Sequence, residues 1–391
     1  MGILYVLLAI LIFGVLIFIH ELGHFLAARA CGVTVNEFAI GMGPRLVSFC
    51  PGKRRAERKK REALQDVGTD GEAGAAEDDA ATPALEPVYT VYSLRAFPIG
   101  GFVSMEGENE ESPDPNSFEK KSVWQRMGIL LAGPLMNIVL GFVLMLTLVC
   151  NSVYMTNYIV YDHEGEKADT VYLSESSGLM SEDKIIKVGS TRVHTGYEVV
   201  YEIMNQGYRA IDITVERNGV VTVVEDVVFP TVVESGMAIG AQDFLLYSYS
   251  KDAMKLGDYI SGAFWRSCST VKMVWDSLAG LFSGRYGMEA VSGPIGVTEV
   301  ITDAAKTDNL SLLYIVTVIT INLGVMNLLP FPALDGGHLF IYLIEVIARR
   351  PIPKKIEGLI NVAGFAVLMI LMVLIATKDI VGLVGRWIGG N

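Results

Sequence analysis

The sequence predicts a mainly α-helical polytopic membrane protein with four transmembrane helices. Hydrophobic residues make up 51% of the 391 residues and the mean hydropathy is +0.41, which is typical of polytopic membrane proteins rather than soluble domains. Four uncharged runs, at residues 2–19, 127–150, 309–334 and 359–377, are each long enough to cross a hydrocarbon core of about 30 Å. We therefore place the four transmembrane helices within residues 1–30, 126–150, 309–338 and 356–377.

Basic residues near the ends of these runs predict the orientation of the chain. Lysines and arginines between residues 53 and 61 follow the first run, Arg126 precedes the second, and residues 349–355 carry four more between the third and the fourth. Cytoplasmic loops are enriched in such residues, so we expect this side to be cytoplasmic and both termini to face outward. A cleaved signal peptide is rejected, because the positive charge follows the first apolar run instead of preceding it.

The first apolar run continues into an H-E-x-x-H motif, which consists of His20, Glu21, Leu22, Gly23 and His24. Residues four apart share one helical face, so both imidazoles can meet one metal ion, while Glu21 is placed to take a proton from water. The alternative is a helix whose two histidines are paired with ordinary polar neighbours. The membrane setting favours zinc ligation, because ionisable residues within a span are costly and usually functional.

A catalytic zinc site needs a third protein ligand and an open position. The third apolar run ends in two prolines that break the helix, followed by Asp335 and His338 on the same side of the membrane as His20 and His24. Asp335 is the first charge after 26 uncharged residues, and a carboxylate there is expensive unless it binds a cation or is paired. We favour Asp335 as the third ligand, with His338 as its rival.

The second span combines small residues with one amide. Gly133 and Gly141 allow close approach of a neighbouring helix, and the amide of Asn137 within the membrane needs a partner. Helix packing and an active-site role are both compatible with this pattern.

The cytoplasmic segment 31–125 contains two kinds of sequence. Residues 53–86 are charged and poor in apolar side chains, which predicts a disordered insertion that is passive by default. Residues 33–51 and 87–108 are strand-like, and we expect a β-hairpin within 87–108. If it dips toward the membrane, it could offer the edge formed by Gly100, Gly101, Phe102 and Val103 to an extended peptide; the residues alone slightly favour the alternative, an ordinary surface hairpin.

The outer segment predicts a small α/β module. Short strand-like runs surround a helix-like stretch within residues 166–232, and Asn218-Gly219 is a strong hairpin signal. Residues 250–296 have apolar side chains at helical spacing and either lie at the outer membrane interface or cap the module. Cys150 and Cys268 could pair on this side, but free thiols are the favoured interpretation.

HELGH in the first span and the segment from Asn327 to Gly337 (NLLPFPALDGG) together resemble the site-2 protease family of intramembrane zinc metalloproteases. The bacterial RseP/RasP-like group, which carries an outward PDZ-like domain, is the most similar part of that family. The resemblance implies Zn²⁺ bound by His20, His24 and Asp335, with Glu21 as the general base. It also implies that Asn327 holds the substrate backbone or oxyanion, and that residues 97–105 form a membrane-associated β-hairpin.

The resemblance extends to the outer segment. Residues 292–296 match a family motif that precedes the third span, and residues 177–186 resemble the PDZ pattern, although Glu182 stands where the family usually has glycine. The acidic tract at residues 66–86 has no counterpart in the family. A bacterial inner-membrane location is implied, with the PDZ-like domain outside the cytoplasm and the active site near the cytoplasmic face.

We therefore predict a zinc metalloendopeptidase that cleaves transmembrane segments. By resemblance, its substrates are single-span membrane proteins such as anti-sigma factors, or signal-peptide remnants. A membrane adaptor with a peptide-binding domain and a structural metal is the main alternative, but a structural site has no use for Glu21. A metal transporter would need polar residues along several spans, and the second and fourth offer almost none. Nothing in the net charge of −12 suggests nucleic-acid binding.

Overall fold

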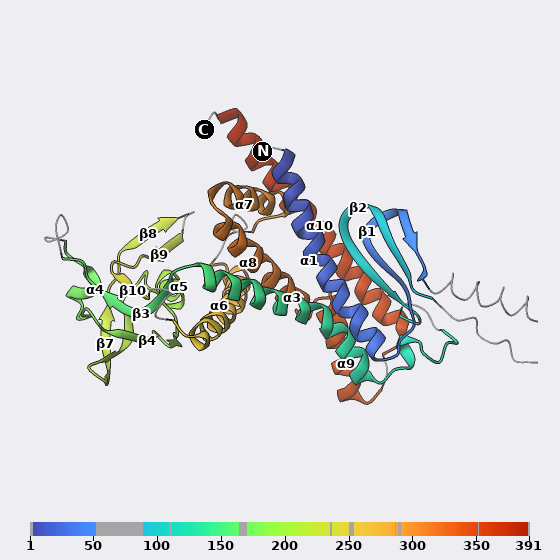
Figure 1. Ribbon diagram of the computed structural model, residues 1–391, viewed down its shortest axis with the longest axis horizontal. Helices are drawn as coiled ribbons and strands as arrows, with labels where there is room; N and C mark the ends of the chain where they lie inside the picture. The colour runs from blue at the N-terminus through green and yellow to red at the C-terminus, as the bar shows by residue number, and fades with distance from the viewer. Residues whose placement is uncertain are drawn as a thin grey trace, which may run out of the picture. The chain divides into compact units, whose positions relative to one another are not determined.

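The computed structural model describes residues 3–51, 89–108, 112–163, 170–234, 237–249, 254–285, 287, 291–350 and 352–389. The helices and strands are labelled in Figure 1, and the chain divides into two compact units. The first comprises Met1–Ile138 with Leu323–Leu371, and the second comprises Val139–Asn322 with Met372–Asn391. The insertion expected at residues 53–86, with its acidic tract at 66–86, lies outside the described residues.

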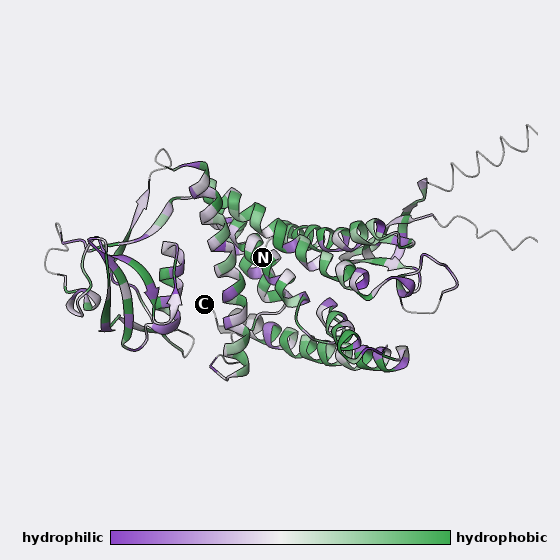
Figure 2. Cartoon of the chain, turned by 90° about the horizontal axis from the view of Figure 1, so that it is seen from below, coloured by the Kyte–Doolittle hydropathy of each residue, from purple (hydrophilic) through white to green (hydrophobic). Residues whose placement is uncertain are grey.

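Four helices of the described chain are long and apolar enough to cross a membrane. They are α1 (Ile3–Ala30), α3 (Val123–Asn151), α8 (Asn309–Asn327) and the part Lys355–Gly382 of α10 (Lys354–Gly389). Only 6% to 39% of the residues in their most apolar windows are buried within the protein, and the hydropathy colouring shows apolar residues along these helices (Figure 2). Apolar side chains exposed along whole helices suit lipid, so the polytopic membrane class is confirmed.

The third predicted span is interrupted where the sequence places its prolines. The helix α8 ends at Asn327, and seven residues separate it from the next helix, α9 (Asp335–Ala348). Pro330 and Pro332 lack the N–H that a helix uses, and Ala333 takes a left-handed conformation with φ +72°. This break delivers Asp335 in the first turn of a new helix.

The β-structure of the first unit consists of two long, bent strands, β1 (Val35–Phe49) and β2 (Val91–Met105). Phe38 lies opposite both Val103 and Tyr92, and Tyr92 also lies opposite Phe49. Four segments therefore lie side by side in the order 101–105, 35–40, 91–95 and 45–49. The hairpin expected within residues 87–108 is corrected, because its two halves do not pair with each other.

The reason for this pairing is the burial of the segment 35–40. Its burial pattern marks it as the central strand, whereas residues 42–49 are exposed. A buried central strand needs hydrogen-bond partners on both sides, and the two halves of β2 supply them. The half formed by residues 101–105 is left as an edge of the sheet.

A buried carboxylate ties three of the four segments together. Glu37, which is 7% exposed, accepts hydrogen bonds from Arg45 at 2.5 Å, from Arg95 at 2.9 Å and from Ser93 at 2.5 Å. Burial of the Glu37 carboxyl opposes its ionisation, but these hydrogen bonds outweigh burial and lower its pKa to about 2.

The core of the first unit joins the bent sheet to α1, to the start of α3 and to α9. The 3₁₀ helix η1 (Phe118–Lys120) contributes Phe118, and Arg126 of α3 pairs with Glu345 of α9 at 3.1 Å across the same region. The buried apolar members are Ala28, Val33, Val35, Phe38, Val103, Met105, Phe118, Ile129, Leu130, Ile341 and Tyr342.

The second unit contains a larger sheet, with strand order β10-β3-β4-β6-β7 and β5 paired with β4. The strands are β3 (Tyr154–Val160), β4 (Lys184–Val188), β5 (Thr191–Arg192), β6 (Ile211–Arg217), β7 (Val220–Val227) and β10 (Leu245–Tyr249). A small separate pair is formed by β8 (Thr231–Glu234) and β9 (Met237–Gly240), and the helices are α4 (Leu173–Ser176) and α5 (Gly196–Gln206). The sheet thus extends beyond the predicted module 166–232 on both sides, because β3 and β10 complete it. A PDZ-like identity stays a prediction.

The backbone of this sheet has positive φ angles at positions that the sequence singled out. Asn218 and Gly219 both have positive φ, at 51° and 78°, and connect β6 to β7 as the sequence predicts. Glu182 adopts φ +72°, which explains why glycine suits its position. The neighbouring Asp183 is buried and paired with Arg217 at 2.7 Å.

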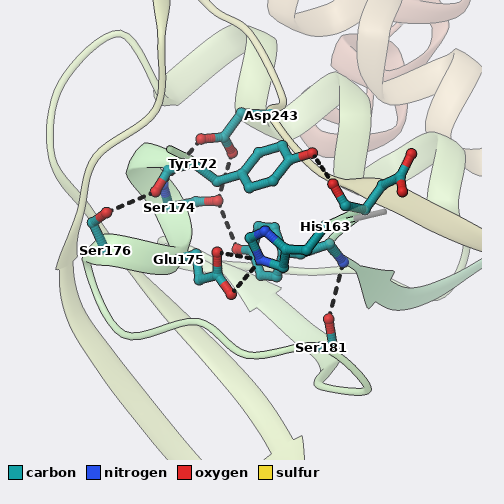
Figure 3. A network of polar contacts seen from close by, with 9 residues as sticks. His163, Tyr172, Ser174, Glu175, Ser176, Ser181 and Asp243 are labelled. Carbon is teal, nitrogen blue, oxygen red and sulfur yellow. Dashed lines mark hydrogen bonds and ion pairs between the residues drawn. The ribbon is translucent and has the colours of Figure 1, made fainter. Parts of the chain in front are cut away.

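Polar contacts hold α4 against the end of this sheet (Figure 3). Ser174 donates to Asp243 at 2.5 Å and also shares a hydrogen bond with Tyr161 at 2.7 Å, while His163 lies 2.9 Å from Glu175. These bonds satisfy the buried polar groups of this region.

Two further helices complete the second unit, α6 (Leu256–Phe282) and α7 (Pro294–Thr307). The carboxylate of Asp379 in α10 accepts hydrogen bonds from the backbone of Gly293 at 3.0 Å and of Gly296 at 3.1 Å. The sequence motif at 292–296 therefore forms a helix N-terminus that a carboxylate caps. Cys150 and Cys268, like the other two cysteines, are free thiols.

We predict that the bent sheet withstands acid. The pKa of Glu37 is lowered from 4.5 to about 2, so its stabilisation is complete above pH 4.5, decreases gradually below that pH and is fully lost once the pH falls through about 2. Limited proteolysis in detergent, with cuts mapped by mass spectrometry, should leave the wild-type sheet intact down to a pH of about 3. Glu37→Gln should be cut there at neutral pH, because each charge-assisted bond contributes roughly 1.5–3 kcal/mol. Cuts in the wild-type sheet that start near pH 4.5 would contradict this explanation.

Candidate metal centre

Three side chains from two distant segments converge in the first unit. His20 and His24 lie on one face of α1 and are buried, with their Nε2 atoms 3.1 Å apart. Oδ2 of Asp335, in the first turn of α9, lies 3.1 Å from Nε2 of His20 and 3.3 Å from Nε2 of His24. The sequence predicted these three residues as a metal-binding set, and the structure brings them together.

The spacing of these atoms fits a tetrahedral metal ion. Bonds of about 2.0–2.1 Å to nitrogen and oxygen at tetrahedral angles separate the ligand atoms by about 3.3 Å. The three observed separations are 3.1, 3.1 and 3.3 Å. Oδ2 of Asp335 is buried, and the described residues supply it with no hydrogen bond apart from the two imidazoles. Two histidines and one carboxylate are a ligand set found in catalytic zinc sites.

The helix α3 fixes the ring of His24. Nδ1 of His24 donates to the carbonyl oxygen of Ile129 at 2.9 Å, so Nε2 keeps a lone pair directed toward Asp335. Gly133, one turn further along α3, leaves space for the ring, because a Cβ there would lie 2.2 Å from Nε2 of His24. At Gly23 the two helices approach so closely that a Cβ would lie 2.3 Å from the carbonyl oxygen of Ala132.

The residue Asn137 lies one further turn along the same face of α3. It is fully buried, and its Nδ2 atom lies 3.4 Å from Nδ1 of His20. The residues alone left helix packing and an active-site role open for Asn137; the contact with His20 places it beside the metal-binding set.

Close packing of glycines holds the loop that carries Asp335. A Cβ at Gly336 would lie 2.1 Å from the carbonyl oxygen of Leu329, and one at Gly337 would lie 2.3 Å from that of Phe331. These glycines begin α9 and allow the preceding loop to pass against it, while the turn itself uses Ala333. Gly364 of α10 contacts the loop from another side, since a Cβ there would lie 2.3 Å from Cβ of Pro332.

His338, the rival third ligand, is engaged elsewhere. Its Nδ1 atom lies 3.0 Å from Oε1 of Glu357, and its Nε2 atom lies 3.2 Å from Nδ2 of Asn361. Both ring nitrogens therefore contact α10, and His338 does not belong to the three-residue set. Glu357, Asn361 and Gly364 lie on one face of α10, at helical spacing, and support α9 and its loop.

Glu21 lies between α1 and the edge of the sheet. A Cβ on Gly101 would lie 3.2 Å from Cγ of Glu21, and the backbone N–H of Val103 donates toward its carboxylate. The charge of Glu21 also interacts with His20, His24 and Asp335. The edge formed by Gly100, Gly101, Phe102 and Val103 is therefore brought next to Glu21.

Two other residues, Asn327 and Glu108, lie outside the three-residue set. Asn327 ends α8, and the described chain shows no hydrogen bond between its side chain and the three-residue set. Glu108, which the sequence did not single out, follows β2 and interacts electrostatically with His24, His338 and Glu21. Burial raises the pKa of the Glu108 carboxyl. A glutamate just after an apolar strand is its only signal in the sequence, because its neighbours come from other elements.

An H-E-x-x-H pair on an apolar helix, with a carboxylate from a broken helix, defines a metallohydrolase site in a membrane protein. The family model of peptidase family M50 matches residues 8–57 and 86–371. A zinc metalloprotease of Clostridium acetobutylicum is 34% identical over 380 residues, covering 96% of this chain and 97% of that protein. The zinc metalloprotease RasP of Shouchella clausii is 27% identical, and the regulator of sigma-W protease RasP of Bacillus subtilis is 28% identical. Each of these covers 95% of this chain and 97% of the relative.

The chain belongs to peptidase family M50 and is a metalloprotease of the site-2 protease type. The family match leaves out residues 58–85, which contain most of the charged insertion.

We predict that Gly133→Ala distorts the geometry of the proposed metal centre and weakens zinc binding. The added methyl group would lie 2.2 Å from Nε2 of His24 and must displace the ring from its bond to Ile129. Zinc affinity should fall by roughly 10–100-fold, as it does when a supporting contact to a metal-ligating histidine is lost. The matched control is Gly128→Ala in the same helix, where nothing lies within 4 Å of the added Cβ. Equal zinc affinities for the two variants would show that α3 does not constrain His24.

We predict that His338→Gln keeps its metal. Both ring nitrogens of His338 are used by contacts with α10, so the substitution removes hydrogen bonds to Glu357 and Asn361 but no ligand. Zinc content of the purified protein should match wild type, while thermal stability falls by an amount of order 1–3 kcal/mol. Loss of zinc as complete as in Asp335→Ala would make His338 a ligand.

Proposed function

We propose that this protein is a zinc-dependent intramembrane endopeptidase that cleaves transmembrane segments of single-span membrane proteins. His20, His24 and Asp335 hold Zn²⁺ in this proposal, and Glu21 is the general base. The observation that carries it is the convergence of three lone-pair atoms within 3.3 Å of one another, beside a carboxylate that belongs to none of the three. A purely structural metal site, as in a membrane adaptor, would not need the carboxylate of Glu21.

The chemistry divides between the ion and the chain. When bound, Zn²⁺ is a Lewis acid that polarises a carbonyl group and makes water more acidic. Glu21 then accepts the proton from the attacking water and returns it to the departing amine. Its carboxylate is held for this by the backbone N–H of Val103. In the family resemblance, Asn327 donates to the substrate backbone or to the oxyanion, and that role is part of the proposal.

The substrate must be unwound before it can be cut. Every amide of a transmembrane helix is hydrogen-bonded within the helix, so water can attack only a locally extended segment. Residues 101–105 form an edge of the bent sheet and lie against Glu21, which suits an extended peptide that adds as a further strand. We propose that this edge, with Gly100, Gly101, Phe102 and Val103, presents the scissile bond.

We also propose a class of substrate and a membrane location for this protein. The relative in Bacillus subtilis is named a regulator of sigma-W protease, and we propose anti-sigma factors or signal-peptide remnants as substrates here. Because basic residues flank the spans on one side, we propose that the active site lies near the cytoplasmic face of a bacterial inner membrane. Both termini and the PDZ-like domain then lie outside the cytoplasm.

The proposal is tested by Glu21→Gln. The amide keeps the shape of the side chain but cannot accept the proton, so cleavage should slow by a factor of roughly 10²–10⁴ or more. Zinc content should be unchanged, because Glu21 is not one of the three ligand residues. The assay uses the full-length protein in detergent with a single-span model substrate, and the products are identified by mass spectrometry.

Two controls frame this experiment. His20→Ala should lose both zinc and cleavage, and Glu175→Gln in helix α4 of the second unit should retain both. A Glu21→Gln variant that cuts at the wild-type rate would exclude Glu21 as the base, and cleavage by zinc-free His20→Ala would exclude the metal.

A further inference from the structure

The two histidines of the centre are anchored by chemically different groups. Nδ1 of His24 faces a carbonyl oxygen, that of Ile129, which can only accept; its proton is therefore fixed at Nδ1. Nδ1 of His20 faces the carboxamide of Asn137 at 3.4 Å. A carboxamide can donate through its nitrogen or, after half a turn about its Cβ–Cγ bond, accept through its oxygen. His20 is thus the one of the two histidines whose anchor allows two proton arrangements.

The first arrangement is complete without a metal ion. With the amide nitrogen of Asn137 toward Nδ1 of His20, the neutral ring carries its proton on Nε2. That proton points to Oδ2 of Asp335, 3.1 Å away. The carboxylate then receives a hydrogen bond, and Nε2 of His24 at 3.1 Å is a second acceptor for the same proton.

The second arrangement requires a cation. With the amide oxygen of Asn137 toward His20, the ring proton lies on Nδ1 and Nε2 presents a lone pair. Three acceptor atoms then face one another at 3.1–3.3 Å with no proton between them. Such a set in a buried environment is stable only around a positive ion.

The surroundings of Asn137 keep its carboxamide at this position. The residue is fully buried, and it follows Ile129 and Gly133 at intervals of four along one face of α3. Helix α8 crosses closely at the same level, because a Cβ at Gly324 would lie 2.9 Å from the carbonyl oxygen of Pro134 and 3.4 Å from Cβ of Asn137.

We propose that Asn137 is a positioning residue that sets the tautomer of His20, and that its amide turns over when the metal ion binds. The inference rests on the proposed metal centre of His20, His24 and Asp335. Asparagine suits this position because aspartate can only accept and an apolar residue can do neither. The polar contact thus stabilises the site both before and after metal uptake.

The experiment compares Asn137→Leu and Asn137→Asp with wild type in the full-length protein in detergent. Zinc affinity is measured by competition with a chromophoric chelator. Leucine, which is similar in size, should weaken zinc binding by roughly 10–100-fold, as expected for loss of a supporting contact to a metal-bound histidine. Aspartate supplies the accepting oxygen and should restore affinity to at least the wild-type level.

A packing control separates this role from loosening of the helices. Val325→Ala removes buried apolar volume from α8 near the same crossing and should lower thermal stability while leaving zinc affinity unchanged. The spectroscopic signature is the nitrogen-15 spectrum of labelled histidine. In wild type the His20 proton should lie on Nε2 without zinc and on Nδ1 with zinc, whereas His24 should carry its proton on Nδ1 in both states.

The possible outcomes are distinct. Wild-type zinc affinity in Asn137→Leu, equal weakening by leucine and aspartate, or a His20 proton on Nδ1 in both states would overturn the inference. If Asn137→Leu does not fold, the aspartate variant and the wild-type spectra decide. Absence of zinc binding by wild type itself would instead remove the proposed metal centre, on which the inference rests.

Discussion

The structure depends on the meeting of three acceptor atoms at one buried point. His20 and His24 belong to the first apolar helix, and Asp335 begins a helix near the other end of the chain. Lone pairs gathered at 3.1–3.3 Å are unfavourable unless a proton or a metal ion lies between them. The surrounding helices therefore serve to hold a set of atoms that would otherwise move apart, and this demand explains the glycines and the polar side chains near it.

Two helix faces meet that demand in different ways. On α3, Ile129, Gly133 and Asn137 recur every four residues and supply a carbonyl, an open space and an amide to the two imidazoles. On α10, Glu357 and Asn361 contact His338 of α9. These contacts anchor the helix that carries Asp335. Helix association in a bilayer gains little from the hydrophobic effect, so it depends on close packing and on hydrogen bonds between helices. Both helix faces provide close packing and hydrogen bonds.

The bent sheet brings a different kind of group to the same place. Its edge at residues 101–105 runs against Glu21, while Glu37, Arg45 and Arg95 hold the other segments together with charge-assisted hydrogen bonds. The side chains of the proposed metal centre thus come from helices, and the edge that we propose for an extended substrate comes from a strand. A metalloprotease that works on helices needs both, because its substrate must be extended at the point of cleavage.

The sequence by itself determined the elements whose signals are local. Three features can be read directly from residue order: the uncharged runs, the spacing of His20 and His24, and the carboxylate that follows a helix broken by prolines. Each of them depends only on residues that are close together in the sequence. The tertiary structure decided what depends on distant partners. Only it separates Asp335 from His338 through the contacts of α10, inserts residues 35–40 between the halves of β2, and brings Asn137 and Glu108 to the site. Such contacts join residues that are far apart in the chain, and no periodic pattern in one segment specifies its partner in another.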